Sequence, residues 1–587
     1  MRCWVGSVLL IALVAGSQPG CSEGTDAIRG GPHHPSQGGH GGSPGAGDRG
    51  GSPGAGDSSL DPDLLVRPSG RGLISGPGAA EFRPVGVTFN DYYWAPGSTI
   101  RDGDHHALAD YQRVADLGMN TVQLMLSYRI FESDDAPLVY LDAGWRWLDE
   151  NIAAARDAGL LVILDLVTAA GADWHDQSAG APDLRFWTEP DYQQRYLALW
   201  EAIARRYANH PTVLAYGLLS EPVTEDATGA QWWNLFEAAR RRVRSVDPHH
   251  LIIADPLMGT RGEYSVPASV ERRRVIDDAR VVYDIHFYEP YEFTHQGATW
   301  TPVELGPVTY PDPTALTLVG DLVHRHSTQD NPALPPGDSD WALYEGVPYL
   351  VTDPDLAASY PTVQCQGDNT GGVAQFDELV VREYDADGEL LRVLGDTSVT
   401  EDSSWYPYPS DLDDVLHRDA DGHADPQSLV ISSSTDTALF STRQIFFRVS
   451  EGNQYQISGW MRGTGIQPSA ECRFTLELYE LDEGASLSGR DRGTITALLD
   501  EALSFGAEHD VPMLVTEFGM TRDALAADRG GLRWLDDVVG AFDERDLGYV
   551  FYTYHSDTMG LYGNEGELPS ENNAEDALLD FFRGHLR

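Results

Sequence analysis

The chain has 587 residues, more than one hydrophobic core usually organises, so we expect two folded domains together with non-globular segments. It contains 40 basic and 91 acidic residues, a formal net charge of −51. This balance argues against nucleic acid or an anionic membrane surface as a partner and fits a neutral substrate. An acidic, well-solvated surface with no functional role explains the same charge.

The N-terminus has the layout of a secretory signal. A short basic start precedes the apolar run from Val5 to Ala15, and small residues lead to Cys21. We therefore assign residues 1–21 to a signal and expect an exported protein. Cys21 stands where the lipidated first residue of a bacterial lipoprotein would stand, but Gln18 occupies a position where such cleavage sites prefer an aliphatic residue. Secretion and lipid anchoring both stay open. No later stretch reaches the roughly 18 apolar residues that span a bilayer.

Residues 22–70 are dominated by Gly, Ser, Pro and Asp. The sequence Gly-Gly-Ser-Pro-Gly-Ala-Gly-Asp begins at Gly41, and a near-repeat of it begins at Gly50. Such a composition is typical of a flexible linker.

From Phe82 onward, short apolar runs alternate with amphipathic stretches, the pattern of β/α units around a parallel sheet. Aromatic and aliphatic residues at helical spacing predict helices over 145–158 and 192–208. Continuous apolar strands imply that both strand faces are buried, which favours a closed (β/α)8 TIM barrel over an open sheet. The eight predicted strands are 84–89, 120–126, 160–166, 213–219, 251–254, 281–287, 513–518 and 549–554.

A second module is predicted between the sixth and seventh strands, which lie much farther apart than a βα loop allows. The composition changes there to strands of period two, which predict a jelly-roll-like β-sandwich. We expect its strands at 374–382, 428–433, 444–449, 454–461 and 473–479, and a return to the barrel with a helix over 494–507. The predicted domains are therefore 71–340 (barrel strands one to six), 341–483 (inserted sandwich) and 484–587 (barrel strands seven and eight).

Four cysteines occur in the chain, and two of them, Cys3 and Cys21, belong to the signal or its boundary. Cys365 and Cys472 remain as the pair available in the folded part, and an oxidising compartment favours a disulfide between them. No cysteine cluster has the spacing of zinc ligands, and His33-His34 lies in the low-complexity tract. We expect no metal and no other cofactor.

Acidic residues end two of the predicted strands. In a β/α barrel the active site forms at the carboxyl ends of the strands, where Glu221 follows strand four and Glu517 ends strand seven. His286 and Tyr288 end strand six. A single acid at a strand end often caps a helix or pairs with Arg. Two carboxylates at one barrel mouth are what glycosidic cleavage needs, since one protonates the leaving oxygen and the other attacks or stabilises the anomeric carbon.

At these residues the sequence resembles glycoside hydrolase family 5, the cellulase-like family. The resemblance covers nearly the whole barrel and includes the segments 186–188, 204–213 and 286–300. It implies retaining double displacement, with Glu221 as acid/base and Glu517 as nucleophile. It also implies that His286 lines the site and that Tyr288 contacts the nucleophile.

Four supporting positions depart from the family pattern. Gln123 stands where the family has Arg on strand two, Val167 replaces the strand-three His, and Ser220 replaces the Asn before the acid/base. On strand eight, Tyr552 takes the place of the expected Trp and keeps an aromatic sugar platform with a smaller area. Gln123 carries no charge, so it lowers the pKa of the nucleophile less than a guanidinium would. Ser220 must reach the 2-hydroxyl of the sugar directly or through water.

Two functional interpretations follow from these departures. One is an active enzyme with a remodelled innermost subsite, and the other is an impaired barrel that binds glycan. Both predict a carbohydrate ligand, and we expect a monomer. Trp174 and Trp300, together with Tyr92, Tyr93 and Trp94, are candidates for outer subsites, although aromatic residues also pack long loops.

Within the insertion, residues 371–379 and 455–463 resemble strands of jelly-roll carbohydrate-binding modules. Their order along the chain is reversed relative to such modules, which suggests a circularly permuted sandwich. Trp405, Tyr406 and Tyr408 are candidates for stacking on a sugar, and the alternative is that they are core or loop residues.

Overall fold

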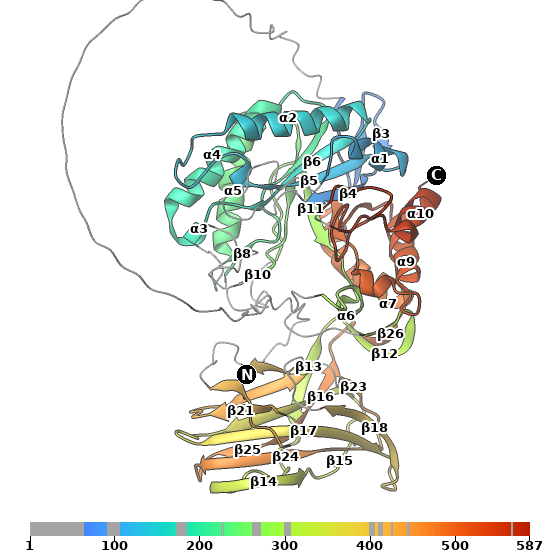
Figure 1. The fold of residues 1–587 in the computed structure, drawn as a ribbon. Coiled ribbons are helices and arrows are strands. Elements are labelled where there is room, and N and C mark those ends of the chain that lie inside the picture. The colour runs from blue at the N-terminus through green and yellow to red at the C-terminus, as the bar shows by residue number, and fades with distance from the viewer. Residues whose placement is uncertain are drawn as a thin grey trace, which may run out of the picture.

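The computed structural model describes residues 64–90, 106–171, 185–298 and 307–586, apart from 225, 227, 261–271, 398–404, 409–414, 424–425, 443–445 and 565–566. These residues form a parallel barrel surrounded by helices, and a second part built of antiparallel sheets (Figure 1). The predicted signal with Cys21, most of the predicted linker, and the aromatic residues Tyr92, Tyr93, Trp94, Trp174 and Trp300 lie outside the described residues.

Eight parallel strands close into a barrel in the order β11-β27-β28-β4-β5-β6-β7-β9. Nearly every strand residue is buried, because helices cover the outside and side chains fill the inside. This explains why the strands read as continuous apolar runs, and the prediction of an eight-stranded barrel is confirmed. The strands are β4 (Val85–Asn90), β5 (Thr121–Ser127), β6 (Leu161–Thr168), β7 (Val213–Gly217), β9 (Leu251–Ala254), β11 (Val281–His286), β27 (Met513–Phe518) and β28 (Gly548–Phe551).

The helices of the barrel follow their strands in sequence. In α4, Pro190 occupies the first turn, where its missing N–H costs nothing, and Arg205 and Arg206 lie in the last turn, where they complement the helix dipole. Where the sequence predicts one helix over 494–507, the structure has two, α7 and α8. The helices of the described residues are α1 (Asp110–Asp116), α2 (Asp142–Asp157), α3 (Arg185–Thr188), α4 (Pro190–Tyr207), α5 (Ala230–Arg244), α6 (Tyr291–Thr294), α7 (Arg492–Ala502), α8 (Ser504–His509), α9 (Gly531–Asp543) and α10 (Asp576–His585). None of them combines the length and the apolar character that crossing a bilayer requires.

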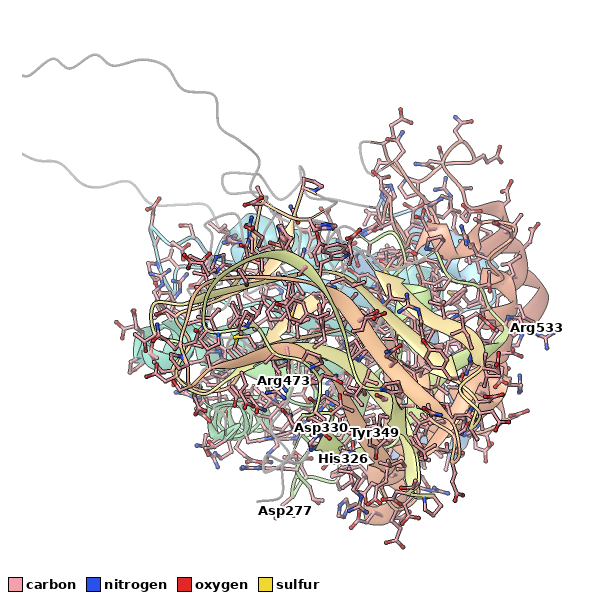
Figure 2. All side chains as sticks on the ribbon, turned by 90° about the horizontal axis from the view of Figure 1, so that it is seen from below. Asp277, His326, Asp330, Tyr349, Arg473 and Arg533 are labelled. Atoms are coloured by element: carbon pink, nitrogen blue, oxygen red, sulfur yellow. A yellow bond between two sulfur atoms is a disulfide. The ribbon has the colours of Figure 1, made fainter. Side chains whose placement is uncertain are left out.

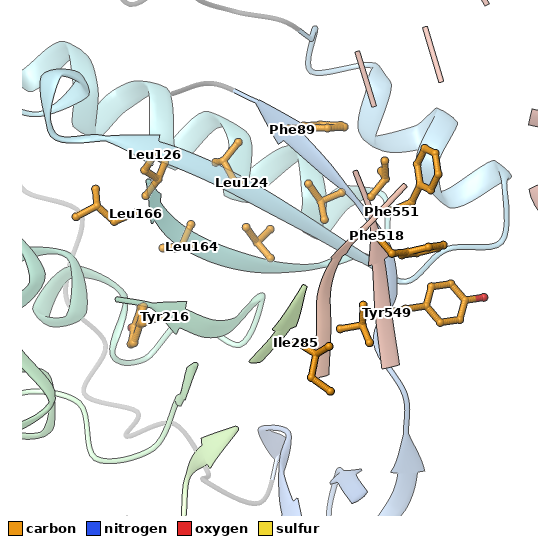
Figure 3. Close-up of a cluster of buried hydrophobic side chains, with 14 of the residues drawn as sticks. Phe89, Leu124, Leu126, Leu164, Leu166, Tyr216, Ile285, Phe518, Tyr549 and Phe551 are labelled. Carbon is orange, nitrogen blue, oxygen red and sulfur yellow. The ribbon is translucent and has the colours of Figure 1, made fainter. Parts of the chain in front are cut away.

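Two apolar clusters hold the barrel together. The larger lies between the strands and the surrounding helices, and Figure 3 shows part of it, with Phe89, Leu124, Leu164 and Phe518 among the labelled side chains. A smaller cluster fills the barrel interior and includes Val66 and Leu73. Leu73 belongs to an N-terminal antiparallel sheet formed by β1 (Arg67–Ser69), β2 (Gly72–Ser75) and β3 (Ala80–Phe82), and Val66 directly precedes β1. Residues 67–69, which we assigned to the linker, are therefore folded, because their apolar neighbours pack against the barrel.

The second part consists of two antiparallel sheets, ordered β13-β25-β16-β22-β19 and β14-β24-β17-β21-β20. Apolar side chains from both sheets form its core, and Cys365 and Cys472 form a disulfide between neighbouring strands. The strands are β13 (Leu322–Ser327), β14 (Gly337–Glu345), β15 (Tyr349–Leu350), β16 (Leu356–Gln366), β17 (Val373–Tyr384), β18 (Leu390–Thr397), β19 (Trp405–Tyr408), β20 (Leu416–Asp419), β21 (Ser428–Ser432), β22 (Ala438–Thr442), β23 (Phe447–Arg448), β24 (Gln454–Ile466) and β25 (Glu471–Leu481).

All strands of these two sheets lie between β11 and β27 in the sequence. The antiparallel pair β12 (Asp312–Val319) and β26 (Ser486–Arg490) connects them to the barrel. The sheets begin at Leu322, and the boundary that we placed at residue 341 falls inside β14. The search for alternating apolar and polar residues did not find the first strands of the sheets. One reason is that β14 is an exposed edge strand without a regular apolar face. Viewed from below, the sheets lie in front of the barrel, with His326 and Tyr349 beside each other (Figure 2).

Of the three aromatic residues considered for sugar stacking in the insertion, Trp405 lies in the core. Trp405 is only 4% exposed and packs in the core between the two sheets, so it is not available for stacking on a sugar. The side chains of Tyr406 and Tyr408 lie outside the described residues.

Candidate active site

The carboxyl ends of three barrel strands bring Glu221, His286 and Glu517 together. His286 is the last residue of β11, Glu517 lies one residue before the end of β27, and Glu221 follows β7. The backbone of Glu221 has φ +49°, a left-handed conformation that is uncommon for a residue with a side chain. Such strained residues cluster at functional sites, where the surrounding structure enforces them.

The two glutamates lie close together. One oxygen of each carboxyl group and a ring nitrogen of His286 are all within 4.8 Å of one another. His286 Nδ1 is 2.9 Å from Oε1 of Glu221 and 3.6 Å from Oε2 of Glu517. The imidazole therefore contacts both carboxyl groups from one side.

Glu517 has a second close partner. The Tyr288 hydroxyl donates a hydrogen bond of 2.8 Å to Oε2 of Glu517. Burial raises the pKa of Glu517 to about 8; the charge of His286 and the Tyr288 hydrogen bond act to lower it, while the charges of Glu221 and Asp165 raise it further. At neutral pH burial therefore favours the protonated form of Glu517, and His286 and Tyr288 favour its ionised form.

His286 is charged. Burial lowers its pKa, but the charges of Glu517 and Asp284 outweigh burial, so the pKa of His286 lies well above its ordinary value. Nε2 of His286 lies 3.0 Å from Oδ2 of Asp284, on the side away from the glutamates.

Gln123 contacts another buried acid. Its Nε2 donates a hydrogen bond of 3.0 Å to Oδ2 of Asp165 on β6, and both side chains are buried. Burial raises the pKa of Asp165 to about 7, and the charges of Asp284 and Glu221 act in the same direction, while His286 opposes them. Gln123 thus satisfies Asp165 with a hydrogen bond and supplies no charge.

The remaining predicted residues lie near this centre or outside the described part of the chain. Ser220 is buried directly before Glu221. Asn90 Nδ2 donates a hydrogen bond of 3.3 Å to the Tyr552 hydroxyl, and the phenol groups of Tyr552 and Tyr288 interact electrostatically, so Tyr552 lies close to the site. Val167, where the resemblance implies His, is also buried.

Sequence reasoning missed a group of residues behind His286. Asp284 precedes it on β11, Asp255 follows β9, and Thr516 precedes Glu517. A polar residue inside an otherwise apolar, fully buried strand is the signal that would have found Asp284 and Asp165. The strand-end rule that selected Glu221 would also have selected Asp255.

Two groups of side chains have the composition of a metal site. They are Glu221, His286 and Glu517, and Asp255, Asp284 and His286, with ligand atoms within 4.8 Å of one another in each group. A histidine nitrogen binds a metal through a lone pair, yet here both nitrogens of His286 face carboxylate oxygens. A doubly protonated imidazole accounts for these contacts, so we interpret both groups as a network of hydrogen bonds and ion pairs.

The barrel is similar to a family of known proteins. Residues 91–352 match the model of Cellulase (glycosyl hydrolase family 5). Cellodextrinase A of Ruminococcus flavefaciens is 34% identical over 195 residues, 33% of this chain and 54% of that protein. Endoglucanase C of Acetivibrio thermocellus is 29% identical over 192 residues, 33% of this chain and 53% of that protein. The chain therefore spans about half the length of these relatives.

Solved structures were compared as well. Thermotoga maritima Cel5A in complex with cellobiose aligns with 85% of this chain and 97% of its own, at 15% identity and a TM-score of 0.44. The family match and the two relatives show that the barrel of this chain is similar to glycosyl hydrolase family 5.

Proposed function

We propose that the protein is a retaining glycoside hydrolase that cleaves β-glycosidic bonds of a glucan, a mannan or a related glycan. The observation that carries this proposal is the separation of the two glutamates, whose nearest oxygens lie within 4.8 Å of one another. Retaining enzymes hold their carboxyl groups roughly 5 Å apart, whereas inverting enzymes need a wider gap that admits a water molecule.

Glu517 acts as nucleophile in the first step. Its carboxylate attacks the anomeric carbon while the glycosidic C–O bond breaks, and Glu221 gives its proton to the departing oxygen. A covalent glycosyl ester on Glu517 results. In the second step Glu221 takes a proton from water, the water oxygen attacks the anomeric carbon, and the ester bond to Glu517 breaks.

The neighbouring residues support these steps. The Tyr288 hydroxyl and the His286 cation stabilise the ionised form of Glu517, which the attack requires. We assign Ser220 to the contact with the 2-hydroxyl of the sugar and Tyr552 to an aromatic platform for the sugar ring. Trp174 and Trp300 remain candidates for outer subsites.

The names of the relatives favour β-glucan among the possible substrates, since two of them are a cellodextrinase and an endoglucanase. An exported, acidic protein with a neutral polymer as substrate agrees with the signal-like N-terminus and the net charge of −51. We expect it to act outside the cytoplasm, secreted or lipid-anchored, as a monomer. The inserted sandwich is proposed to bind carbohydrate as well.

A second candidate function is glycan binding without turnover. It is favoured by the four departures from the family pattern at Gln123, Val167, Ser220 and Tyr552. Both glutamates that turnover needs are nevertheless present and close together, and we therefore prefer the enzyme.

A hydrolysis screen tests the proposal. Wild-type protein, Glu517→Gln and the control Glu544→Gln, which changes an exposed glutamate on the surface of the barrel, are incubated with defined β-glucan and β-mannan oligosaccharides. We expect wild type and Glu544→Gln to release sugar equally and Glu517→Gln to be at least about a thousandfold slower. If no substrate is cleaved, while wild type and Glu517→Gln bind insoluble glucan equally, the binding function replaces the enzymatic one.

A further inference from the structure

We propose that Asp284 is a positioning residue of the active site, which fixes His286 as a cation between Glu221 and Glu517. This inference rests on the proposed function, because it assigns a supporting residue to the same pair of glutamates. Asp284 forms its ion pair with His286 and acts on the glutamates through the imidazole.

Carboxyl groups surround the imidazole on both of its nitrogens. Nδ1 lies 2.9 Å from Glu221 and 3.6 Å from Glu517, and Nε2 lies 3.0 Å from Asp284. A neutral imidazole has one N–H and one lone pair, so one of these carboxylates would face a lone pair. The doubly protonated ring offers an N–H on both sides, and it leaves the proton of Glu221 free for the departing oxygen, whereas a neutral ring would accept that proton at Nδ1. Nε2 and Oδ2 of Asp284 lie at ion-pair distance without the alignment of a hydrogen bond, so the Asp284 carboxylate acts on the ring through its charge.

Asp284 is itself held in place. The Thr516 hydroxyl donates a hydrogen bond to Oδ1, and the Thr516 backbone N–H lies 3.3 Å from the same oxygen. The Arg273 side chain donates a hydrogen bond of 2.8 Å to the backbone carbonyl of Asp284. Burial raises the pKa of Asp284, but the charge of His286, the contact with it and the Thr516 hydroxyl outweigh burial, so the pKa lies below its usual range. Asp284 is therefore ionised opposite His286.

The other acids that face this centre differ in their protonation. Burial raises the pKa of Asp255 well above its usual value, and the charges of Asp284 and Asp165 add to the effect. A neutral Asp255 beside an ionised Asp284 avoids a second negative charge behind His286. Asp165 on β6 also acts on His286, and its own partner, Gln123, is neutral.

The charge of His286 matters because the site otherwise disfavours ionised carboxyl groups. Burial and like charges raise the pKa of Glu517, and the causes that lower it are His286 and the Tyr288 hydrogen bond. Loss of the imidazolium would leave Glu517 protonated over a wider pH range, and a protonated carboxyl group cannot attack the anomeric carbon. Asp284 thus supports the nucleophile indirectly, since Asp284 contacts His286 and His286 contacts Glu517.

The substitution Asp284→Asn tests this role, since it keeps the shape of the side chain and removes its charge. We expect the pKa of His286 to fall, so that the imidazole loses its proton within the accessible pH range. The acid limb of the kcat/KM profile, which reports the ionisation of Glu517, should then move to higher pH by about one unit. At pH 7, kcat should fall about tenfold or more with KM nearly unchanged, because Asp284 does not reach the substrate.

The chain offers a matched control in a second buried Asp–His pair. Asp247 Oδ2 lies 2.6 Å from His250 Nδ1, near the amino end of β9 and thus at the opposite end of the barrel. Asp247→Asn should cost stability in a similar way and leave the pH profile unchanged. If Asp284→Asn folds poorly, Thr516→Val replaces it, since the loss of one hydroxyl donor to Asp284 should shift the profile in the same direction by a smaller amount.

A direct readout separates this inference from the proposed activity. Nitrogen NMR of histidine-labelled protein, with the His286 signal identified by its loss in His286→Gln, reports whether the ring carries two protons. Wild type should be an imidazolium at neutral pH, and Asp284→Asn should lose the second ring proton at a lower pH than wild type. An unchanged His286 signal and an unchanged pH profile in Asp284→Asn would overturn the role of Asp284. Protein that cleaves no glycan but shows the NMR difference would contradict only the proposed function.

Discussion

The Tyr288 hydroxyl donates a 2.8 Å hydrogen bond to Oε2 of Glu517, the proposed nucleophile. This bond stabilises the ionised carboxylate against burial, which raises the pKa of Glu517 to about 8. In Tyr288→Phe the pKa should rise further, so the acid limb of kcat/KM should move to higher pH, and activity at pH 6 should fall about tenfold. The measurement is the pH dependence of kcat/KM.

Tyr291→Phe is the matched control for this change. Tyr291 stacks on His295 with ring centroids 3.9 Å apart, and among the described residues its buried hydroxyl has no hydrogen-bond partner. It should keep the wild-type profile. A shift of equal size in both variants would assign the effect to packing and would contradict the role of the Tyr288 hydroxyl.

Glu517 should also make the protein less stable as the pH rises. Its pKa is raised from about 4.3 in the unfolded chain to about 8 in the folded protein, so the folded state binds more protons between these values. Stability due to this group is fully present below about pH 4 and is lost as the pH rises through 8. Glu517→Gln, which cannot ionise, should therefore unfold at a higher temperature than wild type at pH 8 and at a similar temperature at pH 4.

Thermal unfolding at both pH values gives the answer, with Glu544→Gln as the control on the protein surface. A Glu517→Gln protein that is less stable than wild type at pH 8 would mean that the ionised carboxylate is stabilised in the folded state, contrary to the pKa shift derived from its burial.

Tyr552 should contribute through the face of its ring. Asn90 donates a 3.3 Å hydrogen bond to its hydroxyl and so helps to hold the side chain near Tyr288. Tyr552→Ala removes both the ring and the hydroxyl, whereas Tyr552→Phe removes the hydroxyl alone. Loss of an aromatic surface for sugar stacking should lower kcat/KM about tenfold in the alanine variant, and the phenylalanine variant should stay within about threefold of wild type. Equal losses in both variants would show that the hydroxyl carries the effect.

The disulfide should stabilise the sandwich without affecting the barrel. Cys365 and Cys472 are 107 positions apart, and closing a loop of that length constrains the unfolded chain, typically by about 2–4 kcal/mol. The two parts have separate apolar cores, so we expect Cys365→Ser to lower the unfolding temperature of the sandwich and to leave glycan hydrolysis at 25 °C unchanged. Calorimetry and activity assays on the same samples check this, and a loss of activity in the folded variant would contradict it.

Much of the barrel could be predicted because its strands are buried on both faces. Residues 513–518 and 251–254, for example, are apolar runs that no amphipathic helix or edge strand would show, and both are strands with these bounds. The rule that active sites lie at the carboxyl ends of the strands then selected Glu221, His286, Tyr288 and Glu517, which the structure brings together.

The network behind His286, the position of Trp405 and the start of the sandwich depend on contacts between distant parts of the chain, which the sequence alone does not show. Asp284 and Asp165 lie inside apolar strands, and only the folded barrel shows that both act on His286. For Trp405 the sequence left open whether it stacks on a sugar or packs in a core, and the structure shows it in the core of the two sheets, on a strand that pairs with β22. The start of the sandwich at Leu322 was also hidden, since its early strands are short or exposed.

Covalent trapping of the glycosyl-enzyme tests the central claim most directly. A 2-deoxy-2-fluoro glycoside with a good leaving group, built on a sugar that the wild type releases, slows hydrolysis of the ester and allows the intermediate to accumulate. Mass spectrometry of the digested protein should then find one fluorosugar on the peptide that contains Glu517, and none in Glu517→Gln. A label on any other residue, or release of product with inverted configuration and no label, would contradict the assignment of Glu517 as nucleophile of a retaining hydrolase.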